Sequence, residues 1–115
     1  MSIREATKAS FSDLVKNGVA VVDFFSDDCL PCRLMEKVFE EVDLDMPYLN
    51  IIKVNASKYP TLSRSLEIMA YPTVLFYKNG EELRRHIGFM DAESMKKAAA
   101  GYLYAGKKPS EKREK

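Results

Sequence analysis

The sequence contains no tryptophan, one histidine and two cysteines, and this scarcity excludes several classes of protein. Two Cys and one His are too few to supply four Cys or His ligands to a closed zinc site within one chain. The net charge is only +1, because 18 Lys and Arg nearly balance 17 Asp and Glu. A chain with no overall excess of positive charge has no field that would hold nucleic acid or an anionic membrane, so we expect neither as a partner.

Long apolar segments are also missing. The most apolar stretch, residues 19–25, is interrupted by Asp23 and is far too short to span a bilayer. The N-terminal segment carries an acid at Glu5 and lacks the apolar core of a signal peptide. We therefore expect a cytoplasmic protein. Thiols are kept reduced in that compartment, so two nearby cysteines indicate redox chemistry or metal binding more than a structural disulfide.

The composition is that of one globular domain. Hydrophobic residues make up 46% of the 115 residues and charged residues 30%, which suits a single hydrophobic core. We expect this domain to cover residues 1–106. Residues 107–115 contain no apolar side chain to bury, so we expect a charged, disordered tail. An arm that binds an acidic partner is the alternative.

Strand-like and helix-like segments alternate along the domain. Strands are expected near residues 3–6 and at 19–25, 48–55, 73–77 and 81–87, where β-branched and aromatic residues gather. The Asn-Gly dipeptide between the last two predicts a β-hairpin.

Helical patterns fill the intervals between these strands. A capping box of Ser10 and Asp13 opens the first helix, the second begins at Pro31, the third covers 61–66, and the last runs from an Asp91 cap to a glycine at position 106. The order is β-α-β-α-β-α-β-β-α. Crossover connections imply parallel pairing and the hairpin adds an antiparallel strand, so we predict an α/β fold with a central mixed sheet flanked by helices on both faces.

The motif Cys29-Leu30-Pro31-Cys32 lies where a strand-to-loop passage becomes a helix. Thiol exchange needs one easily ionised sulfur and a second close enough to resolve the mixed disulfide, and a helix N-terminus favours the thiolate. We therefore expect Cys29 to be the nucleophile and Cys32 the resolving thiol. Two alternatives remain: two merely packed cysteines, or a metal site completed by carboxylates or a second subunit, because His86 lies far off in the predicted hairpin.

The segment from residue 22 to 33, which contains this motif, resembles the active-site segment of the thioredoxin family. Residues 71–73 (Tyr-Pro-Thr) resemble the family's cis-proline loop, residues 78–81 its hairpin, and Gly88 the glycine after its last strand. The resemblance covers the chain apart from the tail. It implies a thioredoxin fold and a protein disulfide reductase that binds no cofactor, acts on protein disulfides and is reduced by a thioredoxin-reductase-like donor. We expect a monomer.

The resemblance also implies a role for Asp23, because the family's carboxylate six residues before the first cysteine lies beneath the second one and relays its proton. Burial in an apolar strand would raise the pKa of Asp23 toward the range useful for proton transfer. The alternative is that Asp23 points to solvent. Lys53 matches a family lysine near this carboxylate, and would otherwise be a surface charge.

Three further residues correspond to the substrate-binding part of the family. Pro72 would be cis, and the backbone of Tyr71 would pair with an extended client segment. Gly88 would leave room for the client, or would be an ordinary glycine at a strand end.

Two substitutions at the rim of the site depart from the family pattern. Asp28 stands where the family usually has Trp, and Leu30, which with Pro31 supports the site, replaces the usual Gly. Loss of the Trp removes an aromatic contact surface for partners. We therefore keep two alternatives to a general reductase: a client-specific redox adaptor or sensor, and a disulfide isomerase.

Overall fold

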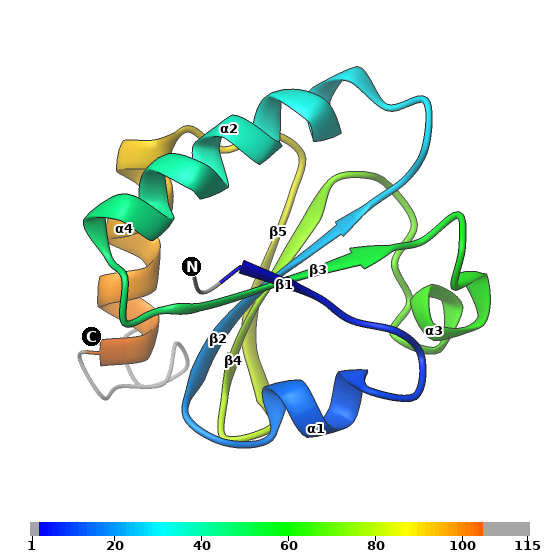
Figure 1. The fold of residues 1–115 in the computed structure, drawn as a ribbon, viewed down its shortest axis with the longest axis horizontal. Helices are drawn as coiled ribbons and strands as arrows, with labels where there is room; N and C mark the ends of the chain where they lie inside the picture. Colours follow the sequence, from blue (N-terminus) through cyan, green and yellow to red (C-terminus); the bar gives the residue numbers. More distant parts are fainter. Residues whose placement is uncertain (1–2, 105–115) are drawn as a thin grey trace, which may run out of the picture.

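A five-stranded mixed sheet forms the centre of the structure, a computed structural model that describes residues 3–104 (Figure 1). Along the sheet the strands lie in the order β1-β3-β2-β4-β5. β1 and β2 run parallel to β3, whereas β4 is antiparallel to β2 and β5 is antiparallel to β4. The strands are β1 Ile3–Glu5, β2 Val19–Phe25, β3 Asn50–Asn55, β4 Thr73–Lys78 and β5 Glu81–Ile87.

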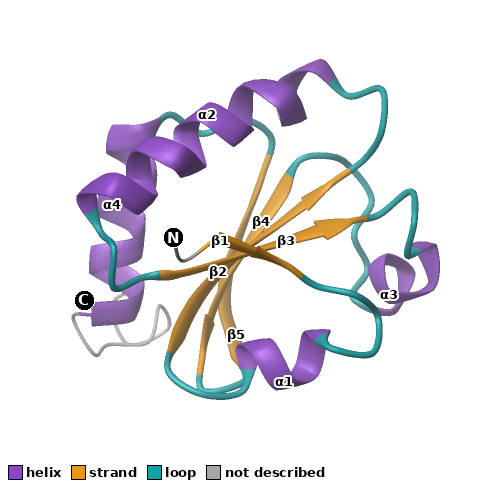
Figure 2. Ribbon diagram, in the orientation of Figure 1, coloured by secondary structure: helices purple, strands orange, loops and turns teal. Residues whose placement is uncertain are grey.

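Helices cover both faces of this sheet, as predicted (Figure 2). α2 (Leu30–Asp45) and α4 (Ala92–Ala99) lie on one face, and a short π-helical segment (Ala100–Tyr104) continues α4. α1 (Phe11–Val15) and α3 (Pro60–Ser65) lie on the other face. The mixed sheet between two helical layers confirms the predicted α/β fold with helices on both faces of a central mixed sheet.

Each face of the sheet carries its own buried cluster. On the α2 face, Met35, Phe39 and Val42 pack with strand residues such as Val21 and Ile51. Neighbouring strand residues point the other way, because successive side chains of a strand alternate between faces. The second cluster, on the α1 face, consists of buried residues Ala6, Phe11, Val15, Ala20, Val22, Phe24, Ile52, Val54, Ile68, Leu75 and Tyr77.

The direction of β4 differs from the prediction that the strand–helix–strand connections are parallel crossovers. Thr73 at the start of β4 pairs with Phe24 near the end of β2, so the chain re-enters the sheet at the end where it left. A helix of six residues advances about 9 Å, whereas a strand of six residues spans about 20 Å. α3 is therefore too short to return the chain to the opposite end of the sheet.

The first helix begins differently from the prediction. Ser10 makes no side-chain capping bond to the helix, so the expected box with Asp13 is wrong. Instead, the Thr7 N–H donates to Ser10 Oγ at 2.9 Å and the Ser10 N–H donates to Thr7 Oγ1 at 3.1 Å. The Thr7 hydroxyl lies three residues before Ser10. The two reciprocal hydrogen bonds between these residues satisfy two backbone N–H groups, one turn before the predicted capping box.

Of the other predicted boundaries, two are confirmed and two lie outside the described residues. The Asp91 cap is confirmed, since Asp91 Oδ1 accepts the Ser94 N–H at 2.9 Å. The Asn79-Gly80 hairpin is confirmed as well: both residues have positive φ, 52° and 85°, in the left-handed region that such a turn requires. The predicted helix end at Gly106 and the predicted tail 107–115 lie outside the described residues.

The packing of α2 predicts the effect of a truncation in the core. Phe39→Ala removes a ring that is fully buried between α2 and the sheet, and should lower the free energy of unfolding by about 3 to 5 kcal/mol. Leu44→Ala, on the same helix but exposed, is the matched control and should change it by less than about 0.5 kcal/mol. Chemical denaturation monitored by circular dichroism measures both, and equal losses would contradict this core.

Candidate active site

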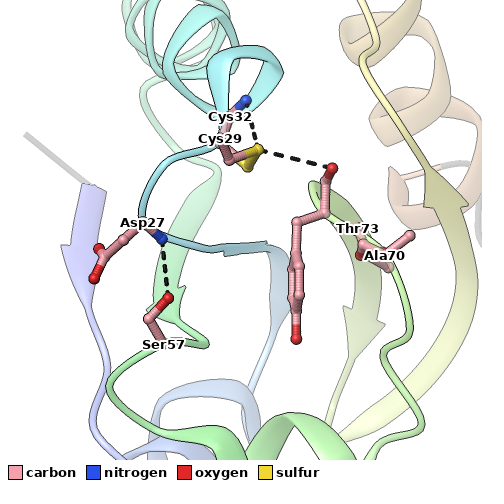
Figure 3. Close-up of a disulfide and its surroundings, with 7 residues drawn as sticks. Asp27, Cys29, Cys32, Ser57, Ala70 and Thr73 are labelled. Carbon is pink, nitrogen blue, oxygen red and sulfur yellow. Dashed lines mark hydrogen bonds between the residues drawn. A yellow bond between two sulfur atoms is a disulfide. The ribbon is translucent and has the colours of Figure 1, made fainter.

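Cys29 and Cys32 form a disulfide at the N-terminus of α2 (Figure 3). Their Cα atoms are 5.2 Å apart. Cys29 is the N-cap of the helix, and its Sγ accepts the Cys32 N–H at 3.2 Å. Pro31 occupies the first helical turn, where its missing N–H leaves no bond unmade. Cys29 is half-buried while Cys32 is only 3% exposed, so Cys29 is the sulfur that a partner can reach.

The loop before the disulfide is tied to the end of β3. The Asp27 N–H donates to Ser57 Oγ at 3.0 Å, as Figure 3 shows, and Asn55 Nδ2 donates to Asp27 Oδ1 at 3.4 Å. Asp28 has a φ of 56°, a left-handed conformation that Asp adopts more readily than most residues. Asn55 and Ser57 were not predicted as site residues. Their polar character directly after an apolar strand is the signal that could have found them.

A second loop faces the disulfide from the start of β4. The Tyr71–Pro72 peptide bond is cis, as the resemblance implies. The Tyr71 carbonyl oxygen lies 3.8 Å from Cys29 Sγ, and Thr73 Oγ1 donates to the Ala70 carbonyl at 2.6 Å, which closes the turn. The backbone of Tyr71 therefore stands beside the accessible sulfur.

Gly88 brings a third segment to the same place. Its N–H donates to the Pro72 carbonyl at 2.8 Å, and its φ of 100° favours glycine. No heavy atom outside its neighbours lies within 4 Å of where a Cβ would stand, so the space beside Gly88 is open. This agrees with the expectation that it leaves room for a bound chain.

Asp23 is fully buried in β2, on the sheet face that α2 covers. Neither carboxylate oxygen has a hydrogen-bond partner among the described residues. Burial raises the pKa of Asp23 from an ordinary value of 3.8 to about 7; Lys53 opposes this rise and Glu36 adds to it. The alternative in which Asp23 points to solvent is therefore wrong. A carboxyl with a pKa near 7 can both take up and release a proton under neutral conditions.

Lys53 lies directly across from Asp23 in the parallel pairing of β2 with β3. Its Nζ is 3.5 Å from Glu36 Oε2 and 5.1 Å from the centroid of the Phe25 ring. The side chain of Lys53 is mostly buried, so it is not simply a surface charge. Sequence reasoning missed Glu36, although its place four residues after Cys32 puts both residues on one face of α2.

A cleft of about 230 Å³ opens beside the disulfide. Its lining is mainly polar and includes Glu36; the residues are Phe25, Ser26, Asp27, Asp28, Cys29, Cys32, Arg33 and Glu36. Exposed apolar side chains stand on the three segments that meet at the disulfide: Leu30, Leu34, Met69, Ile87 and Phe89. The site therefore combines an acidic cleft with an apolar rim.

The described residues contain neither a cluster of metal ligands nor a helix that could span a membrane. Within residues 3–104, no three His, Cys, Asp or Glu side chains come together as metal ligands would. His86 lies in β5, where its Nε2 is 3.2 Å from the Phe89 carbonyl oxygen. In the same range, no helix has the length and apolar character needed to cross a bilayer.

The burial of Asp23 predicts a pH-dependent gain in stability for Asp23→Asn. The unfolded chain loses this proton near pH 4 and the folded chain near pH 7, so ionisation destabilises the fold increasingly between these values. At pH 8 the variant should be more stable than the wild type by on the order of 4 kcal/mol, and this difference should shrink toward pH 4. Denaturation at several pH values measures it. Asp13→Asn, at an exposed position, is the control; a pH-independent difference for Asp23→Asn would contradict the assignment.

Known proteins resemble this chain in sequence and in structure. The sequence profile of the family described as Thioredoxin matches residues 2–100. The thioredoxin of Staphylococcus saprophyticus is 31% identical over 104 residues, which are 90% of this chain and 100% of the relative. The thioredoxin of Chlamydia trachomatis serovar D is 27% identical over 93 residues, 81% of this chain and 91% of the relative.

Two solved structures share the fold. A single-residue mutant of the thioredoxin from Halobacterium salinarum has a TM-score of 0.79 at 22% identity, over 88% of this chain and 89% of that chain. Chloroplastic thioredoxin z has a TM-score of 0.80 at 23% identity, over 92% and 97% of the two chains. The profile and the 31% identical relative show that the chain shares the family as well as the fold. This chain therefore belongs to the thioredoxin family of protein disulfide oxidoreductases, and its Cys29–Cys32 pair serves thiol–disulfide exchange.

Proposed function

We propose that the chain reduces protein disulfides with Cys29 as the nucleophile, Cys32 as the resolving thiol and Asp23 as the proton acceptor. The observation that carries this assignment is the difference in burial between the two sulfurs at the start of α2. The Cys29 sulfur can be reached by a client, and the helix N-terminus stabilises its thiolate. Cys32 is enclosed on the face of α2 that covers the buried carboxyl.

The exchange takes place in two displacements. The Cys29 thiolate attacks one sulfur of the client disulfide, a Cys29–client bond forms, and the other client sulfur leaves as a thiolate. Asp23 then takes the proton of the Cys32 thiol. The Cys32 thiolate attacks Cys29 Sγ, the second client sulfur leaves, and the Cys29–Cys32 disulfide forms. Two electrons pass to the client, and a thioredoxin-reductase-like donor restores the dithiol.

The cis-proline loop and Gly88 form the proposed binding site for the client. An extended client segment pairs with the backbone of Tyr71, whose carbonyl lies 3.8 Å from Cys29 Sγ, and such strand addition brings a client disulfide to the accessible sulfur. Pro72 fixes the direction of this backbone, and the open space beside Gly88 admits the client chain. Leu30 and Pro31 form the rim between the two cysteines. Lys53 lowers the pKa of Asp23.

The remaining features of the proposal follow from the composition of the chain. We place the reaction in the cytoplasm, in a monomer whose domain covers residues 1–106 and whose charged tail covers 107–115. The two cysteines, spaced Cys-x-x-Cys, support the cytoplasmic setting, where thiols are kept reduced.

Turnover of insulin disulfides with dithiothreitol as the reductant tests the two sulfur roles. Wild type should catalyse the reaction, and Cys29→Ser and Cys32→Ser should both abolish it, because each removes one displacement. After reduction and removal of dithiothreitol, Cys32→Ser should also accumulate a mixed disulfide with the client, visible on a non-reducing gel, whereas Cys29→Ser should not. Turnover that survives in either variant, or a mixed disulfide formed by Cys29→Ser, would sink the assignment.

A reductase dedicated to one client is the second candidate. The observation that favours it is the exposed Asp28, which stands at the cleft where the family usually has an aromatic residue. Wild type that fails to turn over insulin, combined with a Cys32→Ser variant that captures one protein from a lysate, would support this narrower activity.

The apolar rim predicts an effect on client affinity alone. Ile87→Ser removes an exposed apolar side chain next to Gly88 and should raise the KM for insulin by about 3- to 10-fold, with kcat unchanged. Leu44→Ser is the matched control: it changes an even more exposed side chain about 20 Å further along α2 than Leu30. Equal effects of the two substitutions on KM would show that the rim does not bind the client.

A further inference from the structure

Glu36 connects the open cleft with the buried carboxyl. It lies on α2 one turn after Cys32, and it lines the cleft together with both cysteines. It is half-exposed, whereas Asp23 is fully buried and does not line the cleft. The link between the two acids is Lys53, which pairs in register with Asp23 and lies 3.5 Å from the Glu36 carboxylate.

The Lys53 ammonium contacts groups other than Asp23. Its Nζ has Glu36 Oε2 at 3.5 Å and the Phe25 ring centroid at 5.1 Å. Asp23 has no hydrogen-bond partner among the described residues, although Lys53 is its direct neighbour across the strands. An ammonium and a buried carboxylate in adjacent register positions would be expected to pair, because burial of an unpartnered carboxylate is unfavourable. Glu36 competes for that ammonium.

The other elements around Asp23 add little charge. On β4 its register partner is the uncharged Val74, and His86 on β5 lies one strand further away. On β1 the exposed Glu5 is the register partner of Lys53. On α2 the charged group that acts on Asp23 is Glu36, and the buried Cys32, which is part of the disulfide, lies one turn before it. Lys53 and Glu36 are therefore the two charged groups that influence the ionisation of Asp23.

We propose that Glu36 is a positioning residue for the resolving step: it holds the Lys53 ammonium away from Asp23, so that the buried carboxyl remains a strong enough base to take the Cys32 proton. This inference rests on the proposed function of Asp23. In the step, the proton moves from Cys32 Sγ to Asp23, the Cys32 sulfur bonds to Cys29 Sγ, and the client sulfur leaves with the electron pair of the broken bond. The effect of Glu36 on the pKa of Asp23, which it raises, has the same direction.

The ionisation of Asp23, followed by NMR of its ¹³C-labelled carboxyl group in the reduced protein, tests this directly. In Glu36→Gln the midpoint should fall by roughly 0.3 to 0.7 pH unit, because Lys53 becomes free to pair with Asp23. Glu40→Gln is the matched control: it removes the same charge from an exposed position one turn further along α2 and should leave the midpoint in place. Equal shifts in the two variants would show a general charge effect and overturn the proposal.

A double-mutant cycle shows whether Glu36 acts through Lys53. Lys53→Met keeps the length of the side chain and removes its charge, and alone should raise the Asp23 midpoint. In the Lys53→Met background, Glu36→Gln should then produce less than half of its shift in the wild-type background. An undiminished shift would mean that Glu36 acts on Asp23 directly, and would overturn the positioning role.

Kinetics connect the titration with the reaction. A preformed Cys29–client mixed disulfide should be resolved more slowly as the pH falls, because Asp23 becomes protonated. This fall in rate should occur at lower pH in Glu36→Gln than in wild type and in Glu40→Gln. The NMR titration needs no client, so it tests Glu36 even if insulin is not reduced. Normal insulin turnover with identical midpoints in wild type and Glu36→Gln would overturn this inference and leave the proposed function intact.

Discussion

The packing of α2 against the sheet fixes the position of both sulfurs. Met35, Phe39 and Val42 hold the helix on the strands, and its first turn consequently starts at the end of β2. The N-terminus of the helix, with its unpaired backbone donors, then coincides with Cys29. The cis-proline loop reaches the same end of the sheet because β4 starts beside the end of β2. A cluster of hydrophobic contacts thus supports a reactive site that is itself small and polar.

Asp23 shows that the site is built at the expense of stability. A carboxyl without a hydrogen-bond partner among the described residues opposes folding whenever it is ionised, and the surrounding hydrophobic clusters must offset this. The same burial makes the carboxyl a useful base near neutral pH. Lys53 and Glu36 adjust this balance from the edge of the site, where solvent still reaches them. The stability of the fold and the ionisation of Asp23 therefore depend on the same few charges.

Sequence reasoning reached the local features and the chemistry of the cysteine pair. The Asn79-Gly80 hairpin, the Asp91 cap and the strand that contains Asp23 follow from local patterns, because turn and cap geometry requires particular residue types. The cis conformation before Pro72 came only from the family resemblance, since a single sequence favours trans.

What the sequence left out depends on contacts between distant segments. The direction of β4 is decided by the end of the sheet at which the chain re-enters, and no local pattern records that. The pairing of Thr7 with Ser10 replaced the expected capping box because Thr7 Oγ1 accepts the Ser10 N–H that the Asp13 side chain would have accepted in that box. Glu36 looked like any exposed glutamate of a helix until Lys53, from a separate strand, was placed beside it.

The strand order has a consequence for solubility. β1 and β5 are the two edges of the sheet, and an open edge is a template on which a second copy could add a strand. β1 is only three residues long, and β5 carries two glutamates and two arginines among its seven residues. Short or charged edges discourage such pairing. Both edges of the described sheet therefore oppose the addition of a strand from a second copy of the chain.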